Sequence, residues 1–310
     1  MQELLRRRAR VRVLARELPR SGASPTGEAD LVLGDITDST CTDRAAGGVS
    51  RVIHMAAIVR SSPPESEAMR VNVGGTENVL RSCLRSGVRS LVHVSSGAAF
   101  SFAPGLPREE RAMRPHSGTL APYALSKLKA ERAVEHAARE GLHASIVYPT
   151  RVFGIGPLNE SNMPAVVLRA YLSGRYRLLP GGGRDWANWA YVPDVARGIV
   201  DAALRGGRSE RYILGGENAT LKTFFDLAGL AAGRRRAMVS VPHTLGRAIA
   251  SLEELRAALA RGSPRLTRAW YASVFEDSRQ SCAKAERELG YTITPLRQAL
   301  EEVITWLRSL

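Results

Sequence analysis

The stretch Ser90-Leu-Val-His-Val-Ser-Ser96 decides the fold class. Its apolar, β-favouring residues lead directly into two hydroxyl side chains, which is typical of a buried strand that ends at the edge of a parallel sheet. Similar apolar runs alternate with helical patterns, and this alternation predicts a doubly wound parallel sheet of the α/β class, with a smaller C-terminal lobe. The predicted strands are 11–14, 30–33, 51–54, 90–94, 143–148 and 211–214, and the predicted helices are 3–10, 76–86, 121–140, 162–174, 193–205, 221–231, 245–260, 281–289 and 295–308.

Length and composition favour a folded protein of the cytoplasm. With 310 residues, of which 44% are hydrophobic, the chain can bury a large core. No apolar run reaches the roughly 18 to 20 residues of a membrane span, and the N-terminus lacks the apolar core of a signal peptide. Cys41, Cys83 and Cys282 show no CxxC spacing, so we expect reduced thiols and no metal site. We also expect no membrane partner.

The net charge of +14 raises the possibility of nucleic-acid binding. However, lysine occurs only at four positions, and the arginines are scattered among glutamates. This pattern is typical of a solvated surface, so we expect no nucleic-acid partner. The four lysines are Lys127, Lys129, Lys222 and Lys284.

Tyr123-Ala-Leu-Ser-Lys127 is the sharpest chemical signal, at the start of a predicted amphipathic helix. A spacing of four puts both side chains on one face, where the ammonium would favour ionisation of the phenol. Ser96, at the end of its strand, could hydrogen-bond the substrate oxygen that Tyr123 protonates. The alternative is an ordinary exposed helix pair. The retention of lysine in an arginine-rich chain argues against that alternative.

The order of several motifs resembles the extended short-chain dehydrogenases, in particular the dihydroflavonol-reductase-like and hopanoid-associated epimerase branch. The resemblance runs from Leu4 to the C-terminus. The motifs are Arg51-Val-Ile-His-Met-Ala-Ala57, Val71-Asn-Val-Gly-Gly-Thr-Glu-Asn-Val-Leu80, Gly87-Val-Arg-Ser-Leu-Val-His-Val-Ser-Ser96, Tyr123 to Lys127, Tyr148-Pro-Thr-Arg-Val-Phe-Gly154, Arg211-Tyr-Ile-Leu-Gly-Gly-Glu-Asn218 and Ala283-Lys-Ala-Glu-Arg-Glu-Leu-Gly-Tyr291.

The resemblance implies a catalytic set of three residues, with Tyr123 as general acid and base. Lys127 would tune Tyr123 and bind the nicotinamide ribose, and Ser96 would contact the substrate oxygen. Asn72 is expected to be structural, bridging strand ends through its amide, and the alternative is a catalytic role. Further cofactor contacts would come from Asp35, Ala56, Ala57, Ser95, Pro149 and Val152, and substrate contacts from Gly97, Ala98, Trp186, Trp189 and Tyr191. Each of these assignments has an alternative. Asp35 could be a carboxylate at the entry of a helix, and Ala56 and Ala57 could serve close packing. The aromatic residues could pack within a lid.

One residue bears on the choice between NADP and NAD as cofactor. After the strand 11–14, an NAD enzyme of this type would place an acid for the ribose hydroxyls, whereas this chain has Arg16. An arginine can pair with a 2′-phosphate, which favours NADP. The alternative is that Arg16 is one more surface arginine.

The resemblance also implies a first strand and a glycine-rich turn before Gln2. Gly22, Gly27 and Gly34 do not have the GxxGxxG spacing, so we expect roughly 20 residues to be absent, including a central strand. A misassigned start site and a true truncation both explain this, and the intact catalytic set favours the first. The expected dinucleotide-binding domain consists of residues 1–154 together with 191–215, where the chain returns to it. The expected substrate lobe consists of residues 155–190 and 216–310.

The expected reaction is reversible carbonyl reduction, or secondary alcohol oxidation, on a small hydrophobic or polycyclic molecule. Gly97-Ala98 replaces the acidic pair of sugar-nucleotide dehydratases, and Ala187 stands where epimerases carry a diphosphate-binding arginine. The alternatives are a sugar epimerase and a non-catalytic cofactor-binding relative. We expect a homodimer through the helices 76–86 and 121–140, with contacts from Leu80, Leu84, Leu128 and Val134.

Overall fold

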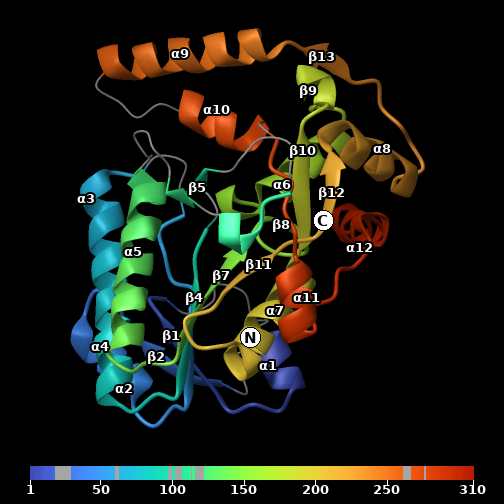
Figure 1. Ribbon diagram of the computed structural model, residues 1–310. Coiled ribbons are helices and arrows are strands. Elements are labelled where there is room, and N and C mark those ends of the chain that lie inside the picture. Colours follow the sequence, from blue (N-terminus) through green and yellow to red (C-terminus); the bar gives the residue numbers. More distant parts are fainter. Residues whose placement is uncertain are drawn as a thin grey trace.

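A four-stranded parallel sheet forms the centre of the larger domain (Figure 1). The computed structural model describes residues 1–17, 29–59, 63–96, 100–101, 107–112, 114–115, 122–260, 267–275 and 277–310. The strand order is β11-β7-β4-β3, and each neighbouring pair is parallel. The carboxyl ends of these strands therefore meet at one edge of the sheet, where α/β proteins bind ligands. The strands are β3 (Arg51–His54), β4 (Ser90–Val94), β7 (Ala144–Pro149) and β11 (Arg211–Leu214).

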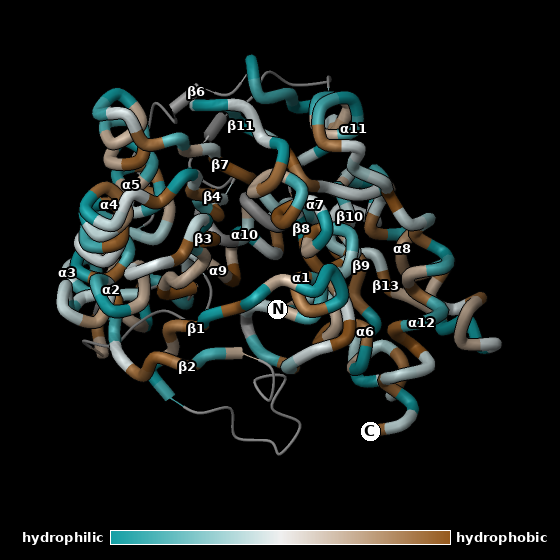
Figure 2. The backbone as a smooth tube through the Cα atoms, turned by 90° about the horizontal axis from the view of Figure 1, so that it is seen from below, coloured by the Kyte–Doolittle hydropathy of each residue, from teal (hydrophilic) through white to brown (hydrophobic). Residues whose placement is uncertain are grey.

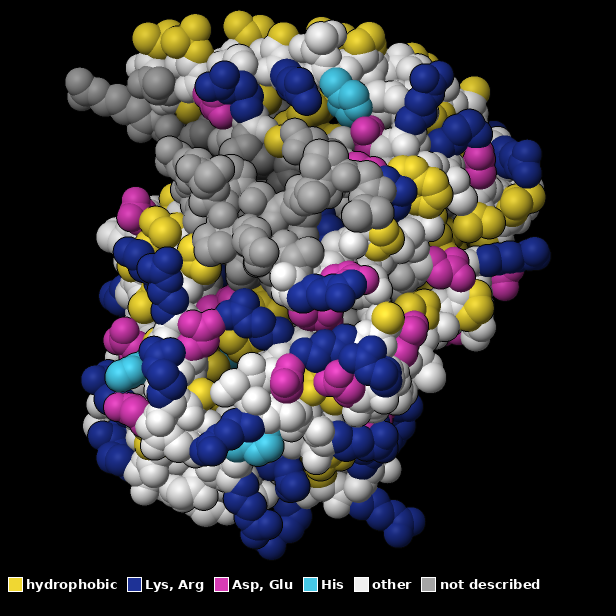
Figure 3. All heavy atoms as spheres, in the orientation of Figure 1, with side chains coloured by type: hydrophobic (Ala, Val, Ile, Leu, Met, Phe, Trp, Pro, Cys, Tyr) yellow, Lys and Arg dark blue, Asp and Glu magenta, His cyan; other side chains and the backbone are white. Residues whose placement is uncertain are grey.

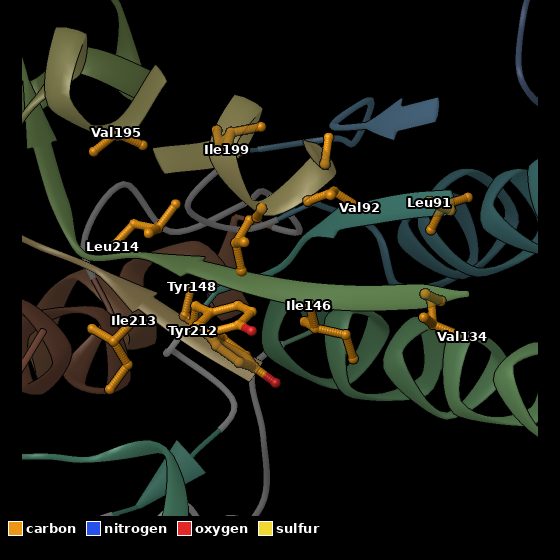
Figure 4. Close-up of a cluster of buried hydrophobic side chains, with 14 of the residues drawn as sticks. Leu91, Val92, Val134, Ile146, Tyr148, Val195, Ile199, Tyr212, Ile213 and Leu214 are labelled. Atoms are coloured by element: carbon orange, nitrogen blue, oxygen red, sulfur yellow. The ribbon is translucent and has the colours of Figure 1, made fainter. Parts of the chain in front are cut away.

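Helices cover both faces of this sheet and close its core. On one face lie α2 (Ser39–Ala46), α4 (Gly75–Arg85) and α5 (Pro122–Arg139), and on the other lies α7 (Val192–Arg205). Figure 4 shows Val134 of α5 on one side of the sheet and Val195 and Ile199 of α7 on the other. The prediction of a sheet wrapped on both faces is confirmed.

The remaining strands of this domain form a separate sheet. β1 (Val11–Ala15) pairs with β2 (Ala29–Leu33) in parallel, and β1 lies on the side nearer β3 in Figure 2. Among the described residues, no strand pairs with the second edge of β1 or of β3. The sheet is therefore interrupted where we expected a further central strand. The short helix α1 (Gln2–Arg6) is tied to α7 through Arg7, whose guanidinium donates to Asp201 at 2.8 Å.

The C-terminal lobe has a second hydrophobic core. Its sheet joins β8 (Arg151–Phe153), β10 (Trp186–Tyr191) and β12 (Glu217–Thr220). Helices α6 (Met163–Leu172), α8 (Leu221–Ala231) and α12 (Leu296–Arg308) pack around them, and α9 (His243–Leu259) and α10 (Arg268–Phe275) form the upper end in Figure 1. Two small sheets complete the strands: β9 (Leu178–Pro180) with β13 (Val239–Val241), and β5 (Phe100–Ser101) with β6 (Arg114–Pro115).

One helix lies on the other side of the expected domain boundary. Leu289 and Tyr291, in and after α11 (Ala283–Leu289), belong to the core of the larger domain, whereas we had placed 216–310 in the lobe. Gly198 of α7 allows this packing, because a Cβ there would lie 2.8 Å from the Tyr291 ring.

The helix expected at 76–86 begins earlier, as a continuous run. α3 (Glu65–Ala68) passes into a π-helical turn, Met69–Gly74, which leads into α4. Gly75 permits close packing here, since a Cβ would lie 2.4 Å from Ile36 Cδ1. π-helical turns are frequent at functional sites, and this one carries Asn72.

The predicted dimer contacts are partly used inside the monomer. Leu80 and Val134 are buried in the core of the larger domain, so their side chains cannot also reach a partner. Leu84 is exposed and Leu128 is half-buried. In the described part of the chain, no helix is long and apolar enough to cross a membrane.

Candidate active site

The structure brings Tyr123, Lys127 and Ser96 together at the carboxyl edge of the sheet. Ser96 follows β4, and Tyr123 and Lys127 lie one turn apart at the start of α5. The Ser96 hydroxyl forms a hydrogen bond with the phenol of Tyr123. Tyr123 and Lys127 were expected on one face of this helix from their spacing, and Ser96 was expected beside them from its place at the strand end; their catalytic roles stay a prediction.

Lys127 is a buried cation. Its side chain lies in the interior, and its Nζ donates to the main-chain oxygen of Val94 at 2.7 Å. Burial disfavours the charged form and lowers its pKa to about 8, while the carboxyl of Glu131 opposes this shift. An ammonium has three donors. The one directed at Val94 fixes the side chain next to the strand end.

Tyr123 has a raised pKa in this structure. Burial is the larger cause, and the hydrogen bond from Ser96 acts in the opposite direction. We had expected Lys127 to dominate and to favour the phenolate, but its ammonium is directed at Val94. The phenol of Tyr123 is therefore protonated near neutral pH, which suits a group that gives a proton to a substrate oxygen.

Glu131 is a member of the site that our sequence reasoning missed. It is buried, and its carboxylate accepts hydrogen bonds from Ser95 Oγ and from the Tyr148 hydroxyl, the latter at 2.8 Å. Burial raises the pKa of Glu131, and these hydrogen bonds oppose the shift. Its position four residues after Lys127, on the same face of α5, was the signal that could have found it. Ser95 thus acts as a partner of Glu131, beside the expected cofactor site.

Asn72 joins three segments below the site. Its Oδ1 accepts from the main-chain N–H of Ile58 at 2.8 Å, and its Nδ2 donates to Ser126 Oγ at 2.9 Å. These contacts tie the loop after β3 to helix α5. The geometry agrees with the structural role that we expected for Asn72.

Two neutral histidines lie between the sheet and its helices. His54 and His93 are opposite each other on β3 and β4, with ring centroids 5.3 Å apart. Burial, assisted by the positive charge of Lys127, lowers the pKa of His54 to about 3 and moves the pKa of His93 in the same direction. Both rings are therefore uncharged at neutral pH.

Arg16 and Asp35 lie together at the carboxyl edge of the β1–β2 sheet. Arg16 directly follows β1 and is exposed, and its charge contributes to the lowered pKa of Asp35. The larger causes of that shift are hydrogen bonds from Thr37, whose main-chain N–H donates to Asp35 Oδ1 at 2.8 Å. Asp35 therefore closes the turn after β2 through its Oδ1. Its Oδ2 and the Arg16 guanidinium lie at the carboxyl edge of this sheet, where the adenosine end of a dinucleotide is expected.

The other expected cofactor residues occupy the same edge. Ala56 is exposed and Ala57 is half-buried in the loop after β3, while Pro149 ends β7 and Val152 lies in β8. These positions would hold the adenosine and nicotinamide ends of a dinucleotide. Among the described residues, no glycine-rich turn opens a helix beside them to hold the pyrophosphate. The residues present therefore fit the two ends of the cofactor. No group of three or more His, Cys, Asp or Glu residues in the described ranges could hold a metal ion.

The three aromatic residues expected at the substrate have different surroundings. Trp189 is buried, stacks on Phe224 at 4.0 Å and donates from Nε1 to the main-chain oxygen of Ala219. Tyr191 is buried and donates to Glu302. Both rings therefore build the core of the lobe, and only Trp186, with 39% of its surface exposed, is open to a ligand. Gly97 and Ala98 lie outside the described residues.

Comparison with known proteins identifies the class. The model of the NAD dependent epimerase/dehydratase family matches residues 1–215. The chain belongs to this family, within the extended short-chain dehydrogenases, and it is an enzyme of the NAD-dependent oxidoreductase and epimerase type. The resemblance drawn from the ordered motifs is confirmed.

Individual relatives extend over nearly the whole chain. The chain is 28% identical to sterol demethylase protein B of Methylococcus capsulatus over 314 residues. This alignment covers 100% of the chain and 94% of the relative. The chain is 27% identical over 281 residues to the 4-hydroxy-2-methyl-3-oxo-4-farnesyl-3,4-dihydroquinoline-1-oxide ketoreductase of Stigmatella aurantiaca, covering 89% of this chain and 81% of the relative. The crystal structure of gox2253 superposes with a TM-score of 0.83 at 32% identity, covering 99% of this chain and 93% of that chain.

A dinucleotide held at this edge would supply or accept a hydride through its nicotinamide. Tyr123 would then give its phenolic proton to the oxygen of the reacting carbon, or take it back in the reverse direction. The hydrogen bond from Ser96 fixes the Tyr123 oxygen, and Ser96 would contact the same substrate oxygen. Lys127, one helical turn away, would contribute positive charge that stabilises the phenolate left after proton transfer.

The pKa of Lys127 sets an expected pH limit. We expect the rate of carbonyl reduction to fall as pH rises above about 8, because Lys127 then loses the charge that stabilises the phenolate. The folded pKa lies below the unfolded value of 10.5, so the unfolded chain binds more protons between these values. This group therefore makes unfolding less favourable as pH rises through that window. Initial rates measured between pH 8 and pH 10 test the expected loss of activity, and denaturant midpoints in the same range test the expected gain in stability. A rate that stays level to pH 10 contradicts the role given to the Lys127 charge.

Proposed function

We propose that the chain is a reductase of small apolar carbonyl compounds that also catalyses the reverse oxidation. One observation carries this proposal: Tyr123 is protonated and fixed by Ser96 at the strand end, with the Lys127 cation one turn away. A protonated acid is the form that carbonyl reduction requires. The names of two relatives, which refer to a sterol and to a farnesylated quinoline, support an apolar substrate.

Epimerisation of a sugar derivative is the second candidate, and the family name supports it. Against it stands Ala187, which is buried in β10 where a diphosphate-binding arginine was expected. The exposed ring of Trp186 also favours a flat, apolar ligand. We therefore place reduction first.

We further propose NADP as the preferred member of the NAD family of cofactors. The exposed guanidinium of Arg16 lies next to Asp35 at the end of β1, where it can pair with a 2′-phosphate. We also retain a cytoplasmic homodimer as a proposal, with Leu84 and Leu128 as the remaining apolar contacts on α4 and α5.

A carbonyl panel tests this function. We expect NADPH oxidation with hydrophobic ketones and none with UDP-sugars, and slower oxidation of NADH. Arg16→Ala should reduce the preference for NADPH by about tenfold, since one charge-assisted hydrogen bond is lost. Arg89→Ala, an exposed arginine before β4 at the opposite edge, is the matched control and should leave the preference unchanged.

The assays are run on this chain. Conversion of UDP-sugars without net cofactor oxidation would support epimerisation instead. An unchanged preference in Arg16→Ala would remove the argument for NADP.

A further inference from the structure

Helix α9 carries a row of exposed large apolar side chains along one face. Their spacing of four, three, three and four residues places them on the same side of the helix. We call them the α9 stripe: Leu245, Ile249, Leu252, Leu255 and Leu259, with exposed fractions of 52%, 50%, 66%, 56% and 79%.

The opposite face of α9 is packed, so the stripe cannot turn inward. Ala250 and Ala257 are buried there. At the start of the helix His243 shares hydrogen bonds with Asp185 at 2.9 Å and with Tyr271 of α10 at 3.1 Å. These contacts hold α9 in one orientation on the lobe. The stripe lies along the upper edge of the molecule, where Figure 3 shows apolar side chains in a row.

The acidic residues of α9 are neutralised, and the chain as a whole is basic. Glu253 is paired with Arg256, and Glu254 with Arg268. A further arginine of α9, Arg247, lies on the far side of the helix from the stripe, beside Asp185 and Tyr271. The whole chain carries a net charge of +14, and Figure 3 shows Lys and Arg side chains just below the apolar edge. An apolar stripe on a basic protein is complementary to a surface of anionic lipids.

A second copy of the chain is a weaker occupant. A helix of 17 residues is about 26 Å long and about 10 Å wide. That footprint is well below the about 800 Å² per partner of a standard interface. A lipid surface needs no complementary shape and accepts such a narrow face.

We propose that the α9 stripe docks this enzyme onto the surface of a membrane rich in anionic lipids. The apolar side chains enter the boundary between headgroups and acyl chains, and the arginines contact the headgroups. From the sequence we expected no membrane partner, because no segment could span a bilayer. That argument did not address contact with a surface, and α9 shows such a contact face.

Vesicle binding tests this proposal without a substrate or cofactor. Phosphatidylcholine vesicles with and without phosphatidylglycerol are sedimented with the full chain. We expect binding to the anionic vesicles, weaker binding to pure phosphatidylcholine, and a loss of about tenfold or more in Leu252→Gln with Leu255→Gln. The control, Leu204→Gln with Leu230→Gln, changes two leucines that are 47% and 49% exposed on α7 and α8, and should bind like the wild type.

A dye on the stripe gives a second readout. The three cysteines of the chain are buried, so a Leu255→Cys variant takes an environment-sensitive label at one exposed position. Its emission should shift to the blue on anionic vesicles. No vesicle binding by the wild type overturns the proposal, as does equal binding by the α9 variant. If light scattering shows a dimer that only the α9 variant loses, the stripe belongs to a second copy.

Discussion

Replacing Tyr123 with phenylalanine should lower the rate of carbonyl reduction by about a hundredfold or more and leave dinucleotide affinity nearly unchanged. The phenol oxygen carries the proton that the substrate receives, and the phenylalanine ring fills the same space. Ser96 would keep its place at the strand end but lose its hydrogen-bond partner. Rates are measured with the ketone that is turned over best, and affinity by titration of the cofactor.

The control for this prediction makes the same chemical change elsewhere. Tyr171→Phe removes a hydroxyl from the buried core of the lobe, and its rate should stay close to the wild type. A rate in Tyr123→Phe above about a tenth of the wild type, less than roughly 1.4 kcal/mol of barrier, excludes Tyr123 as the acid.

Replacing Lys127 with alanine should differ in kind, because rate and cofactor affinity should fall together. The ammonium is expected to bind the ribose and to stabilise the phenolate, so we expect about tenfold weaker affinity and a further hundredfold loss of rate. Lys127→Arg should not restore activity, since the planar guanidinium on a longer arm cannot donate to Val94 from the same point.

Lys129→Ala serves as the matched control for Lys127. It lies two residues further along α5 and is exposed, so neither rate nor affinity should change. If Lys127→Ala lost rate alone, with unaltered affinity, its role at the ribose would be refuted.

The sheet was predictable because its strands carry a local signal. Apolar runs set the strands at 51–54, 90–94 and 211–214, and the structure has these bounds. Helix α2 (Ser39–Ala46) was missed, because its short polar sequence shows little periodicity. It begins instead at the Asp38 cap, which accepts from the Thr40 N–H at 2.8 Å.

The side-by-side placement of the expected catalytic pair was predictable for the same reason, and the residues around it were not. The interval between Tyr123 and Lys127 is one helical turn, so sequence spacing alone puts them together. Glu131 lies one further turn along α5, but its partners are Ser95, just after β4, and Tyr148 of β7, which are distant from it in sequence. The aromatic ring of Trp189 gave no sign in the sequence that it would stack on Phe224.

Transfer of deuterium from NADPH that carries two deuterium atoms at C4 tests the central claim most directly. The best ketone is incubated with this chain, and the alcohol is analysed by mass spectrometry. We predict one deuterium on the carbinol carbon with the wild type, and little or none with Tyr123→Phe. An alcohol without deuterium, or equal transfer by Tyr123→Phe, would contradict a reductase whose proton comes from Tyr123.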